Sequence, residues 1–316
     1  MKSLWPPWIV LGVLILLPLG RASEAPLVVG AVAGSVLAWR QRALLRADAG
    51  VRLAVILFAC YWLAALISAP GAVAPEKSWS TVAALLRFLP FALFACLALR
   101  KAAWWPLLVD ACAAVVVLWL LDAWVQILTG WSLAGAETAD RLSGIFGAGN
   151  LKLGPVLAVL SPFVFVAARR RWGWRGLAVA FVFQLMPILF AGSRAAWIMY
   201  ALVALACVWM HTRAPLRFAA WSFAAACAAL LGIAVAWQHS GRFDMRFDRT
   251  LLALGGTEQA LDTASAGRLR IWHTALAMSA AHPVAGVGVR GFRYAYPQYA
   301  QAGDAFVDAQ TDEGAF

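Results

Sequence analysis

Long apolar stretches separated by short charged segments occupy the chain from its start to Trp237. Each stretch is long enough, or nearly so, to cross the roughly 30 Å hydrocarbon core of a bilayer as an α-helix. The predicted spans are residues 5–19, 26–39, 51–69, 80–99, 104–128, 151–168, 176–190, 195–210 and 218–237. The pattern therefore predicts an all-α, polytopic membrane protein with nine transmembrane helices in a domain over residues 1–237.

The pattern changes after Trp237. Residues 238–316 carry seven arginines and eight acidic residues but no apolar run of membrane length. We interpret this part as a second domain, one large segment outside the membrane. Within it, Ser265 is a suitable N-cap for a helix that would end at His282-Pro283. Arg268 and Trp272 would then lie one turn apart on the same face of that helix.

Charge in the loops predicts which ends of the spans face the cytoplasm. One alternating set of loops is strongly basic, whereas the other set carries most of the acidic residues before Trp237. The basic set comprises Lys2, Arg40, Arg42, Arg46, Arg52, Arg100, Lys101, Arg169, Arg170, Arg171, Arg175, Arg213 and Arg217. By the positive-inside rule this set is cytoplasmic, so Arg194 and residues 238–316 are predicted to lie outside.

Composition excludes several other classes of protein. The chain is 63% hydrophobic and only 13% charged, which is too apolar for a soluble domain. Its net charge of +11 is dispersed among the apolar spans, a distribution that does not indicate nucleic-acid binding. The five cysteines lie within apolar runs, without paired spacing or nearby histidines. We therefore expect no disulfide framework, no metal site and no cofactor.

Arg87 and Asp122 are ionisable residues inside the predicted spans. Arg87 is predicted about seven residues from the outer end of its helix, roughly 10 Å deep and within reach of the headgroups. Asp122 lies in the outer half of its helix and is a candidate partner for Arg87 or Arg194. A charge at such a depth is a candidate for a functional site, although snorkelling to the surface explains the arginine equally well.

The segment Gly286-Val287-Gly288-Val289-Arg290-Gly291 matches the dinucleotide-binding pattern G-x-G-x-x-G. That pattern binds a pyrophosphate only between a strand and a helix, and here a helix and His282-Pro283 precede it. We therefore predict a flexible turn and no nucleotide site. His282 is a candidate site residue because it is close in sequence to Arg268, but a structural histidine is the favoured interpretation.

Extracytoplasmic arginines are the remaining candidates for a binding site. Arg194 lies between two apolar runs, at the predicted membrane surface. A guanidinium presents a planar pair of donors to phosphate oxygens and stays charged at any working pH, so a lipid-linked diphosphate would suit it. The arginines of the outer segment with the same potential include Arg268, Arg270, Arg290 and Arg293. Candidates for stacking on sugar rings, or equally for an interfacial aromatic belt, are Phe292, Tyr294, Tyr296 and Tyr299.

Three motifs together resemble the O-antigen ligase family, which also includes O-antigen polymerases and bacterial protein O-oligosaccharyltransferases. The motifs are Ala191-Gly192-Ser193-Arg194-Ala195-Ala196-Trp197, Gly267-Arg268 with Trp272, and His282-Pro283 with Gly286-Val287-Gly288 and Phe292. Their order and membrane context agree with the family over essentially the whole chain. The resemblance implies a GT-C-like, inverting, metal-independent glycosyltransferase of the bacterial inner membrane, with an active site that faces the periplasm.

The resemblance also implies the substrates and their site. The donor would be a glycan on undecaprenyl diphosphate, held by Arg194 and Arg268, and the acceptor of a ligase would be the lipid A core. Membrane lipids are expected partners, and nucleic acid is not. A polymerase or a protein O-oligosaccharyltransferase would use the same kind of donor. From a different class, a lipid-linked glycan flippase or another transporter would keep ionisable residues along a path through the membrane.

The end of the chain departs from the family pattern. The family's general base is a histidine shortly after an acidic-glycine stretch, which here is Thr311-Asp312-Glu313-Gly314, and the chain ends at Phe316. Further spans are expected after the outer segment as well. We therefore expect a sequence that is truncated at its C-terminus, with the catalytic histidine beyond Phe316. Such a chain would bind the donor without turnover.

Overall fold

The computed structural model describes residues 5–42, 47–99, 104–136, 141–212, 214–239, 268–301, 304 and 306–307. Contacts divide the chain into two compact units. Unit 1 comprises residues 1–26 and 101–246, and unit 2 comprises residues 27–100 and 247–316. Because this grouping follows contacts and not membrane position, three predicted spans share unit 2 with the predicted outer segment.

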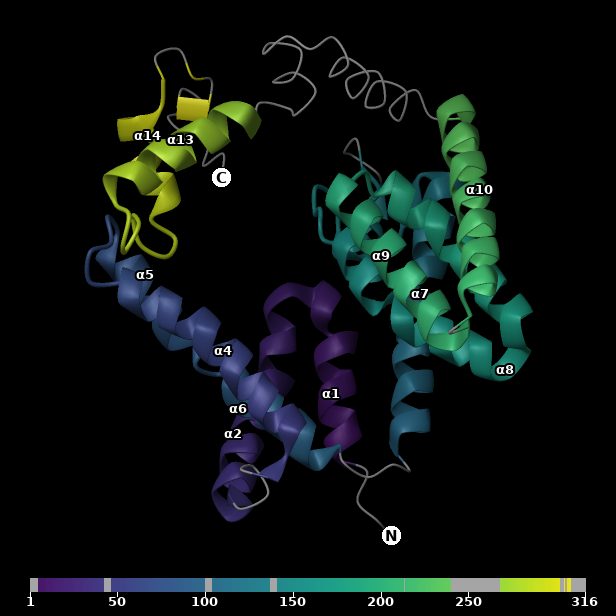
Figure 1. The fold of residues 1–316 in the computed structure, drawn as a ribbon, viewed down its shortest axis with the longest axis horizontal. Helices are drawn as coiled ribbons and strands as arrows, with labels where there is room; N and C mark the ends of the chain where they lie inside the picture. The colour runs from purple at the N-terminus through teal and green to yellow at the C-terminus, as the bar shows by residue number, and fades with distance from the viewer. Residues whose placement is uncertain are drawn as a thin grey trace. The chain divides into compact units, whose positions relative to one another are not determined.

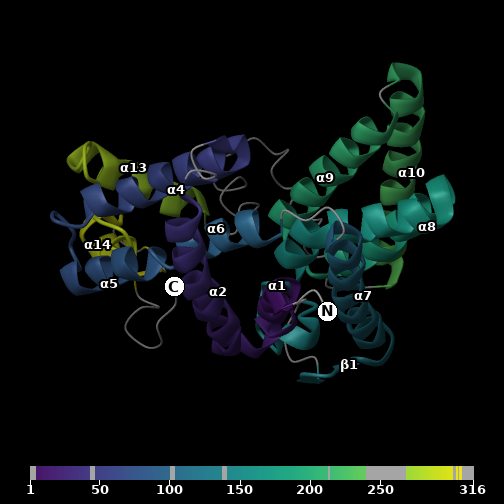
Figure 2. The same ribbon diagram turned by 90° about the horizontal axis from the view of Figure 1, so that it is seen from below.

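Unit 1 contains, in chain order, α1 (Trp5–Ile15), the 3-10 helix η1 (Leu17–Ser23), α7 (Trp104–Thr129), strands β1 (Trp131–Ser132) and β2 (Gly135–Ala136), the 3-10 helix η2 (Gly144–Phe146), α8 (Leu153–Phe190), α9 (Arg194–Thr212) and α10 (Pro215–His239). Helix α8 contacts α7, α9 and α10, and α7 also contacts α1 (Figures 1 and 2). The two short strands pair antiparallel in the connection between α7 and α8. Unit 1 is therefore a helical bundle centred on α8.

Helix α8 reverses direction at Gly173 and so forms two arms. Gly173 has φ +63° and ψ −147°, a backbone conformation that favours glycine. Phe165 and Phe181, which are equally far from Gly173 in sequence, both pack on Tyr200 of α9, with ring centroids 5.8 and 5.4 Å from its ring. The predicted spans 151–168 and 176–190 are therefore the two arms, and the predicted basic loop between them is a tight helical turn.

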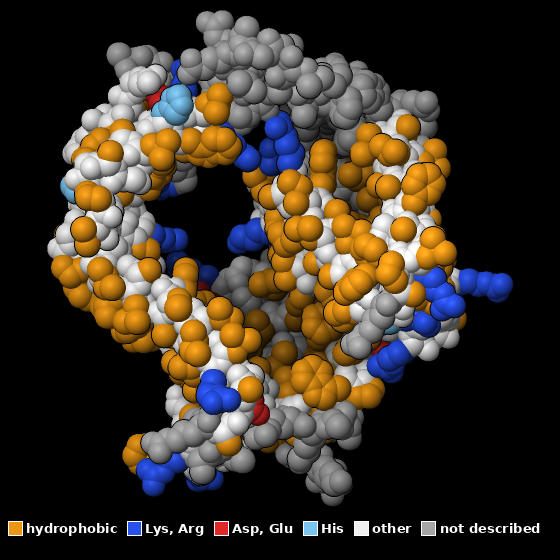
Figure 3. Space-filling model, in the orientation of Figure 1, with side chains coloured by type: hydrophobic (Ala, Val, Ile, Leu, Met, Phe, Trp, Pro, Cys, Tyr) orange, Lys and Arg blue, Asp and Glu red, His pale blue; other side chains and the backbone are white. Residues whose placement is uncertain are grey.

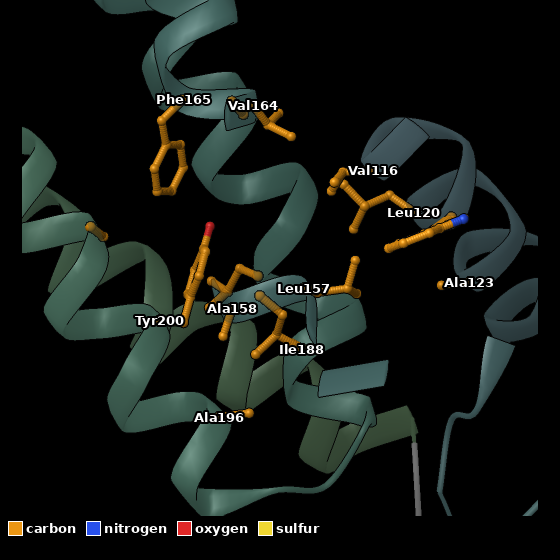
Figure 4. Close-up of a cluster of buried hydrophobic side chains, with 14 of the residues drawn as sticks. Val116, Leu120, Ala123, Leu157, Ala158, Val164, Phe165, Ile188, Ala196 and Tyr200 are labelled. Atoms are coloured by element: carbon orange, nitrogen blue, oxygen red, sulfur yellow. The ribbon is translucent and has the colours of Figure 1, made fainter. Parts of the chain in front are cut away.

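The core of unit 1 lies where α7, both arms of α8 and α9 meet. Leu157 of the first arm and Ile188 of the second arm are fully buried. Figure 4 shows their side chains next to each other, with Val116 and Leu120 of α7 pointing toward Leu157. Between helices that lie in lipid, such close packing replaces the hydrophobic driving force that acts in water. The core thereby fixes the ends of these helices relative to one another.

Unit 2 contains most of α2 (Glu24–Arg40), together with α4 (Ala49–Ser68), α5 (Pro75–Leu85), α6 (Phe88–Ala98), α13 (Arg268–Ala281) and α14 (Phe292–Tyr299). Asp48 caps α4 by accepting the N–H of Val51 at 3.1 Å, and Pro75 begins α5. Helix α4 contacts α5 and α6, and α13 contacts α14. Figure 1 shows α13 and α14, in yellow, beside the turn between α4 and α5.

Seven helices of the described residues are long and apolar enough to cross a membrane, and one of them is the two-armed α8. No more than 44% of any of these spans is buried within the protein. Large apolar side chains such as Leu118, Ile198 and Leu231 are exposed, and apolar atoms dominate the surface in Figure 3. Helices that are apolar yet unburied suit a lipid surrounding. The fold is therefore an all-α polytopic membrane protein, as predicted.

The first predicted span is shorter than expected. Helix α1 has 11 residues, against the predicted span 5–19. Such a helix is about 16 Å long, well below the thickness of a bilayer core. The 3-10 helix η1 follows it, with Gly20 at φ +62° breaking the helical path. The structure joins η1 and α2 into the candidate span Leu17–Arg40.

Candidate functional site

A tight turn between α8 and α9 presents Arg194 at the end of the bundle opposite Gly173. We call residues 191–197 the Arg194 turn. Arg194 is the first residue of α9, and its side chain is exposed. Gly192 adopts φ +66° and donates its N–H to the carbonyl oxygen of Leu189 at 3.0 Å. The Ser193 hydroxyl accepts the N–H of Ala196 at 3.4 Å and so caps α9.

Packing on the start of α8 anchors the Arg194 turn. The Trp197 indole N–H donates to the carbonyl oxygen of Ile188 at 3.1 Å. A Cβ on Gly154 would lie 3.0 Å from Ala191 Cβ and 3.3 Å from Ala196 Cβ, so only glycine allows this approach without a shift. Each residue type of the motif thus has a structural role in the turn. Glycine permits the positive φ, serine caps, alanine permits close packing, and tryptophan anchors the turn.

Two further basic residues, Arg141 and Lys152, lie at the same end of unit 1 as Arg194. The N–H of Leu142 donates to the carbonyl oxygen of Phe190 at 3.2 Å, which places Arg141 next to the Arg194 turn in the fold. Lys152 immediately precedes α8, whose first turn packs on the Arg194 turn. Neither residue is among the site candidates that the sequence suggested. The sequence signal for both was their position in or next to the predicted loop between spans 104–128 and 151–168, which is not one of the basic loops.

Asp122 and Gln126 support the loop that carries Arg141. Both are buried on α7, with 6% and 1% exposure. One Asp122 oxygen, Oδ1, accepts the N–H of Leu133 at 2.7 Å, and Gln126 Oε1 accepts the N–H of Gly144 at 2.7 Å. The other Asp122 oxygen has no hydrogen-bond partner within the described residues. Among the described residues Asp122 thus serves the loop through Oδ1, and the suggested ion pair with Arg194 is not seen there, whereas Arg87 belongs to unit 2.

Arg87 lies farther from the start of its helical span than the sequence predicted. The candidate span runs from Pro75 to Ala98 and consists of α5 and α6, which are separated at Leu86 and Arg87. Arg87 is therefore about 18 Å along the span, near its middle, because a helix rises about 1.5 Å per residue. Its guanidinium carbon lies 5.3 Å from the centroid of the Phe88 ring. The helical span begins five residues earlier than expected, and the depth of Arg87 below the membrane surface stays a prediction.

Helix α13 presents Arg268 and Trp272 on its exposed face. It begins at Arg268, and Trp272 is 57% exposed. A different face contributes the buried Thr274 and Met278, and Met278 packs with Tyr296 of α14. The predicted helix from Ser265 is thus confirmed from Arg268 onward, and the residues before it lie outside the described part of the chain. The shared face of Arg268 and Trp272 is as predicted.

His282 has a structural partner. Helix α13 ends at Ala281, so the predicted helix stop at His282-Pro283 is confirmed. The Nε2 atom of His282 lies 2.9 Å from the Tyr299 hydroxyl, and the two rings are edge to face with centroids 6.2 Å apart. This contact joins the end of α13 to the end of α14.

The aromatic run of α14 divides between core and surface. Tyr296 is fully buried, donates its hydroxyl to Asp304 Oδ2 at 2.8 Å and packs on Phe292. Burial and this hydrogen bond raise the pKa of the Tyr296 phenol, so it stays a protonated donor at neutral pH. Tyr294 is 45% exposed. Sugar stacking therefore suits Tyr294 and not Tyr296.

The turn over residues 286–291 is docked on the connection between α4 and α5. Val289 donates its N–H to the Ser68 hydroxyl at 3.2 Å, and its carbonyl oxygen accepts the Ser78 hydroxyl at 2.7 Å. The N–H of Val73 donates to the carbonyl oxygen of Val287 at 3.1 Å. A turn was predicted and is confirmed, but it is anchored at three points, so the expectation of a flexible turn is wrong. The next residue, Arg290, is exposed and has φ +61°.

Replacing Gly288 with alanine is expected to release this turn. Gly288 has φ +89°, and a Cβ there would overlap Ala72 and lie 2.7 Å from its Cα. Backbone strain and overpacking each cost about 1–3 kcal/mol. We expect faster hydrogen exchange at the amides of Val73 and Val289. Gly286→Ala is the matched control, because Gly286 also has a positive φ (+62°) but meets nothing within 4 Å. Equal exchange in the two variants would contradict the role of the close approach.

The structure assigns the candidate arginines to both units. Arg194 belongs to unit 1, and Arg268, Arg290 and Arg293 belong to unit 2, with all four side chains exposed. Exposed guanidinium groups on the Arg194 turn and at the start of α13 can bind an anionic group such as a diphosphate. Across the described parts of the chain, no three His, Cys, Asp or Glu side chains gather in a group that would hold a metal ion.

A comparison with protein families finds a match. A family model described as O-antigen ligase matches residues 179–312, a range that includes the Arg194 turn, α9, α10, α13 and α14. No curated protein and no solved structure matches the chain.

Proposed function

Because the chain is a member of the O-antigen ligase family, we propose that it is an inverting glycosyltransferase that moves an O-antigen glycan from undecaprenyl diphosphate to the lipid A core. The observation that carries this proposal is the exposed Arg194 at the end of an apolar helix pair, with Arg141 and Lys152 at the same end. The diphosphate of a membrane-anchored donor lies at the membrane surface. A cationic surface at that level would hold it.

The transfer step assigns a role to the arginines. The acceptor hydroxyl oxygen attacks the anomeric carbon from the side opposite the diphosphate, and the bond from that carbon to the diphosphate oxygen breaks. The departing diphosphate takes the bonding electron pair, so negative charge grows on its oxygens in the transition state. Arg194 and Arg268 would stabilise this charge through hydrogen bonds that strengthen as it develops. The hydroxyl proton passes to a general base.

The proposed orientation places this chemistry on the periplasmic side of the inner membrane. Unit 1 separates two groups of basic residues, with Arg169, Arg170 and Arg171 next to Gly173 and Arg194 at the other end of the same helix pair. The arginines next to Gly173 belong to the strongly basic set of loop residues, which the positive-inside rule assigns to the cytoplasm. The Arg194 end would then meet a donor that has already reached the outer leaflet.

A transfer assay with the purified full-length protein tests this function. The protein is mixed with undecaprenyl-diphosphate-linked glycan and lipid A core, and the products are separated by size. The expected result is glycan attached to the lipid A core, with free undecaprenyl diphosphate released. Longer lipid-linked glycan formed from the donor alone would instead identify a polymerase. Movement of intact donor across a vesicle membrane, without any new glycosidic bond, would contradict the proposal and favour a transporter.

A further inference from the structure

An apolar cavity of about 260 Å³ lies between α8, α9 and α10, all within unit 1. It is lined almost entirely by apolar side chains, including Leu177 of α8 and Trp221 of α10. These two residues, and Cys207 near the end of α9, lie toward the Gly173 end of the bundle. The cavity therefore extends from the middle of the bundle toward the Gly173 end, which the positive-inside rule assigns to the cytoplasm.

Aromatic contacts connect this cavity to a charged group. Trp221, which lines the cavity, stacks on Trp174 with ring centroids 4.8 Å apart. The Arg169 guanidinium lies over Trp174, 4.7 Å from its ring centroid. The Arg169 Nε is buried without a hydrogen-bond partner in the described residues, and so is the hydroxyl of Ser222, another lining residue. Ser222 in the cavity wall, and Arg169 beyond the two tryptophan rings, thus each have unused hydrogen-bonding capacity.

Positive charge is in excess around the turn at Gly173. Arg170 and Arg171 share the carboxylate of Asp110, at 3.2 and 3.5 Å. Arg169 and Arg175 add two more positive charges near this turn. Figure 3 shows Lys and Arg side chains gathered over this end of α8. One shared carboxylate cannot neutralise four guanidinium groups, so the surface attracts an anion.

We propose that this cavity and the arginines around Gly173 form a binding site for an anionic phospholipid of the cytoplasmic leaflet. One acyl chain occupies the cavity between α8, α9 and α10. The phosphate of the headgroup contacts Arg169 and the neighbouring guanidinium groups. Trp174 and Trp221 lie between chain and headgroup, the depth that tryptophan prefers in membranes. The site is separate from the Arg194 turn and does not depend on glycosyl transfer.

The positive charge of the arginines around Gly173 favours a lipid with an anionic headgroup over a neutral one. An acyl chain alone would enter the cavity from any phospholipid, because the lining is apolar. Each arginine near an anionic headgroup contributes about 1 kcal/mol, which is roughly a fivefold gain in affinity. A zwitterionic headgroup gains little from the same arginines. Preference for the anionic lipid is therefore the property that identifies this site.

Native mass spectrometry of the purified full-length protein tests the proposal. The protein in neutral detergent is titrated with dioleoyl phosphatidylglycerol or with dioleoyl phosphatidylcholine, and bound lipids are counted. We expect tighter binding of phosphatidylglycerol. The double variant Arg169→Gln/Arg175→Gln should lose this preference by roughly fivefold for each arginine. The matched control Arg40→Gln/Arg52→Gln removes the same charge from exposed positions in unit 2 and should keep it.

A second pair of variants tests the cavity itself. Ala225→Phe places a ring in the cavity, whereas Ala220→Phe adds the same ring to an exposed position of α10 that does not line it. We expect Ala225→Phe to weaken phosphatidylglycerol binding and Ala220→Phe to leave it unchanged. Equal affinity of the wild-type protein for the two lipids would overturn the proposal. Unchanged binding in Ala225→Phe, with an unchanged thermal unfolding midpoint, would overturn the assignment of the cavity to the acyl chain.

Discussion

Replacing Arg194 with alanine is expected to lower glycan transfer by about 10²–10³-fold while the protein stays folded. The side chain is exposed on the first residue of α9, and the turn that presents it is held by backbone groups and by Ser193 and Trp197. Removing the guanidinium therefore leaves the turn intact. If Arg194 stabilises the charge on the departing diphosphate, the loss falls mainly on kcat and less on KM. The measurement is steady-state transfer with the purified protein.

Two variants make the Arg194 test specific. Arg194→Lys keeps the positive charge but loses the planar pair of donors, so we expect activity between those of the wild type and the alanine variant. Arg217→Ala is the matched control, since Arg217 is also an exposed arginine in the first turn of a unit 1 helix, at the opposite end of the bundle. The Arg217→Ala variant should retain the glycan transfer rate of the wild type. Full activity of Arg194→Ala would refute the role of this residue in holding the diphosphate.

Replacing Arg268 with alanine is expected to lower transfer by a similar factor, about 10²–10³-fold. Arg268 is the first residue of α13 and its side chain is exposed, so its loss removes no buried core side chain. We expect circular dichroism and the unfolding midpoint to match the wild type. The assay is again transfer, combined with a separate measurement of donor binding by the purified protein. Weaker donor binding with unchanged kcat would show that Arg268 binds the ground state and not the growing charge.

The control for Arg268 comes from the same unit. Arg52 is an exposed arginine in the first turn of α4, on the side that the loop charges assign to the cytoplasm. Arg52→Ala should leave transfer unchanged, because the same charge is removed away from the proposed donor. An equal loss of transfer in Arg52→Ala and Arg268→Ala would indicate a general effect of net charge and would contradict a specific role for Arg268.

Much of the fold was predictable because lipid imposes strict rules on sequence. A span must be apolar over about 20 residues, and its loops reveal its direction by their charge. Gly173 is an example. The four arginines around it predicted a loop, and α8 reverses direction at this residue. Helix α13 was found from its spacing and from the His282-Pro283 stop. The family was recognised from the Arg194 turn and the residues around Arg268, and the family match at residues 179–312 confirms it.

Properties that depend on distant partners were not predictable. The sequence suggested an arginine as the partner of Asp122, but its carboxylate supports the loop at Leu133. The start of the span that contains Arg87 was placed five residues too late, because its first turn, from Pro75, is polar enough to look like a loop. The 286–291 turn was expected to be flexible because its glycines permit many conformations. In the fold, hydrogen bonds with Ser68 and Ser78 hold the turn in one conformation.

The sequence by itself determined that the chain is a helical membrane protein, which ends of its spans carry the basic loops, and which family motifs it contains. Each of these depends on local composition and spacing, because a span must satisfy its own backbone hydrogen bonds within lipid. Only the tertiary structure decided that Gly154 packs under the Arg194 turn, that Arg141 and Lys152 share its end, and that Val289 is held by two serines of unit 2. These features require contacts between residues far apart in sequence, and no local pattern encodes which distant surface a side chain will meet.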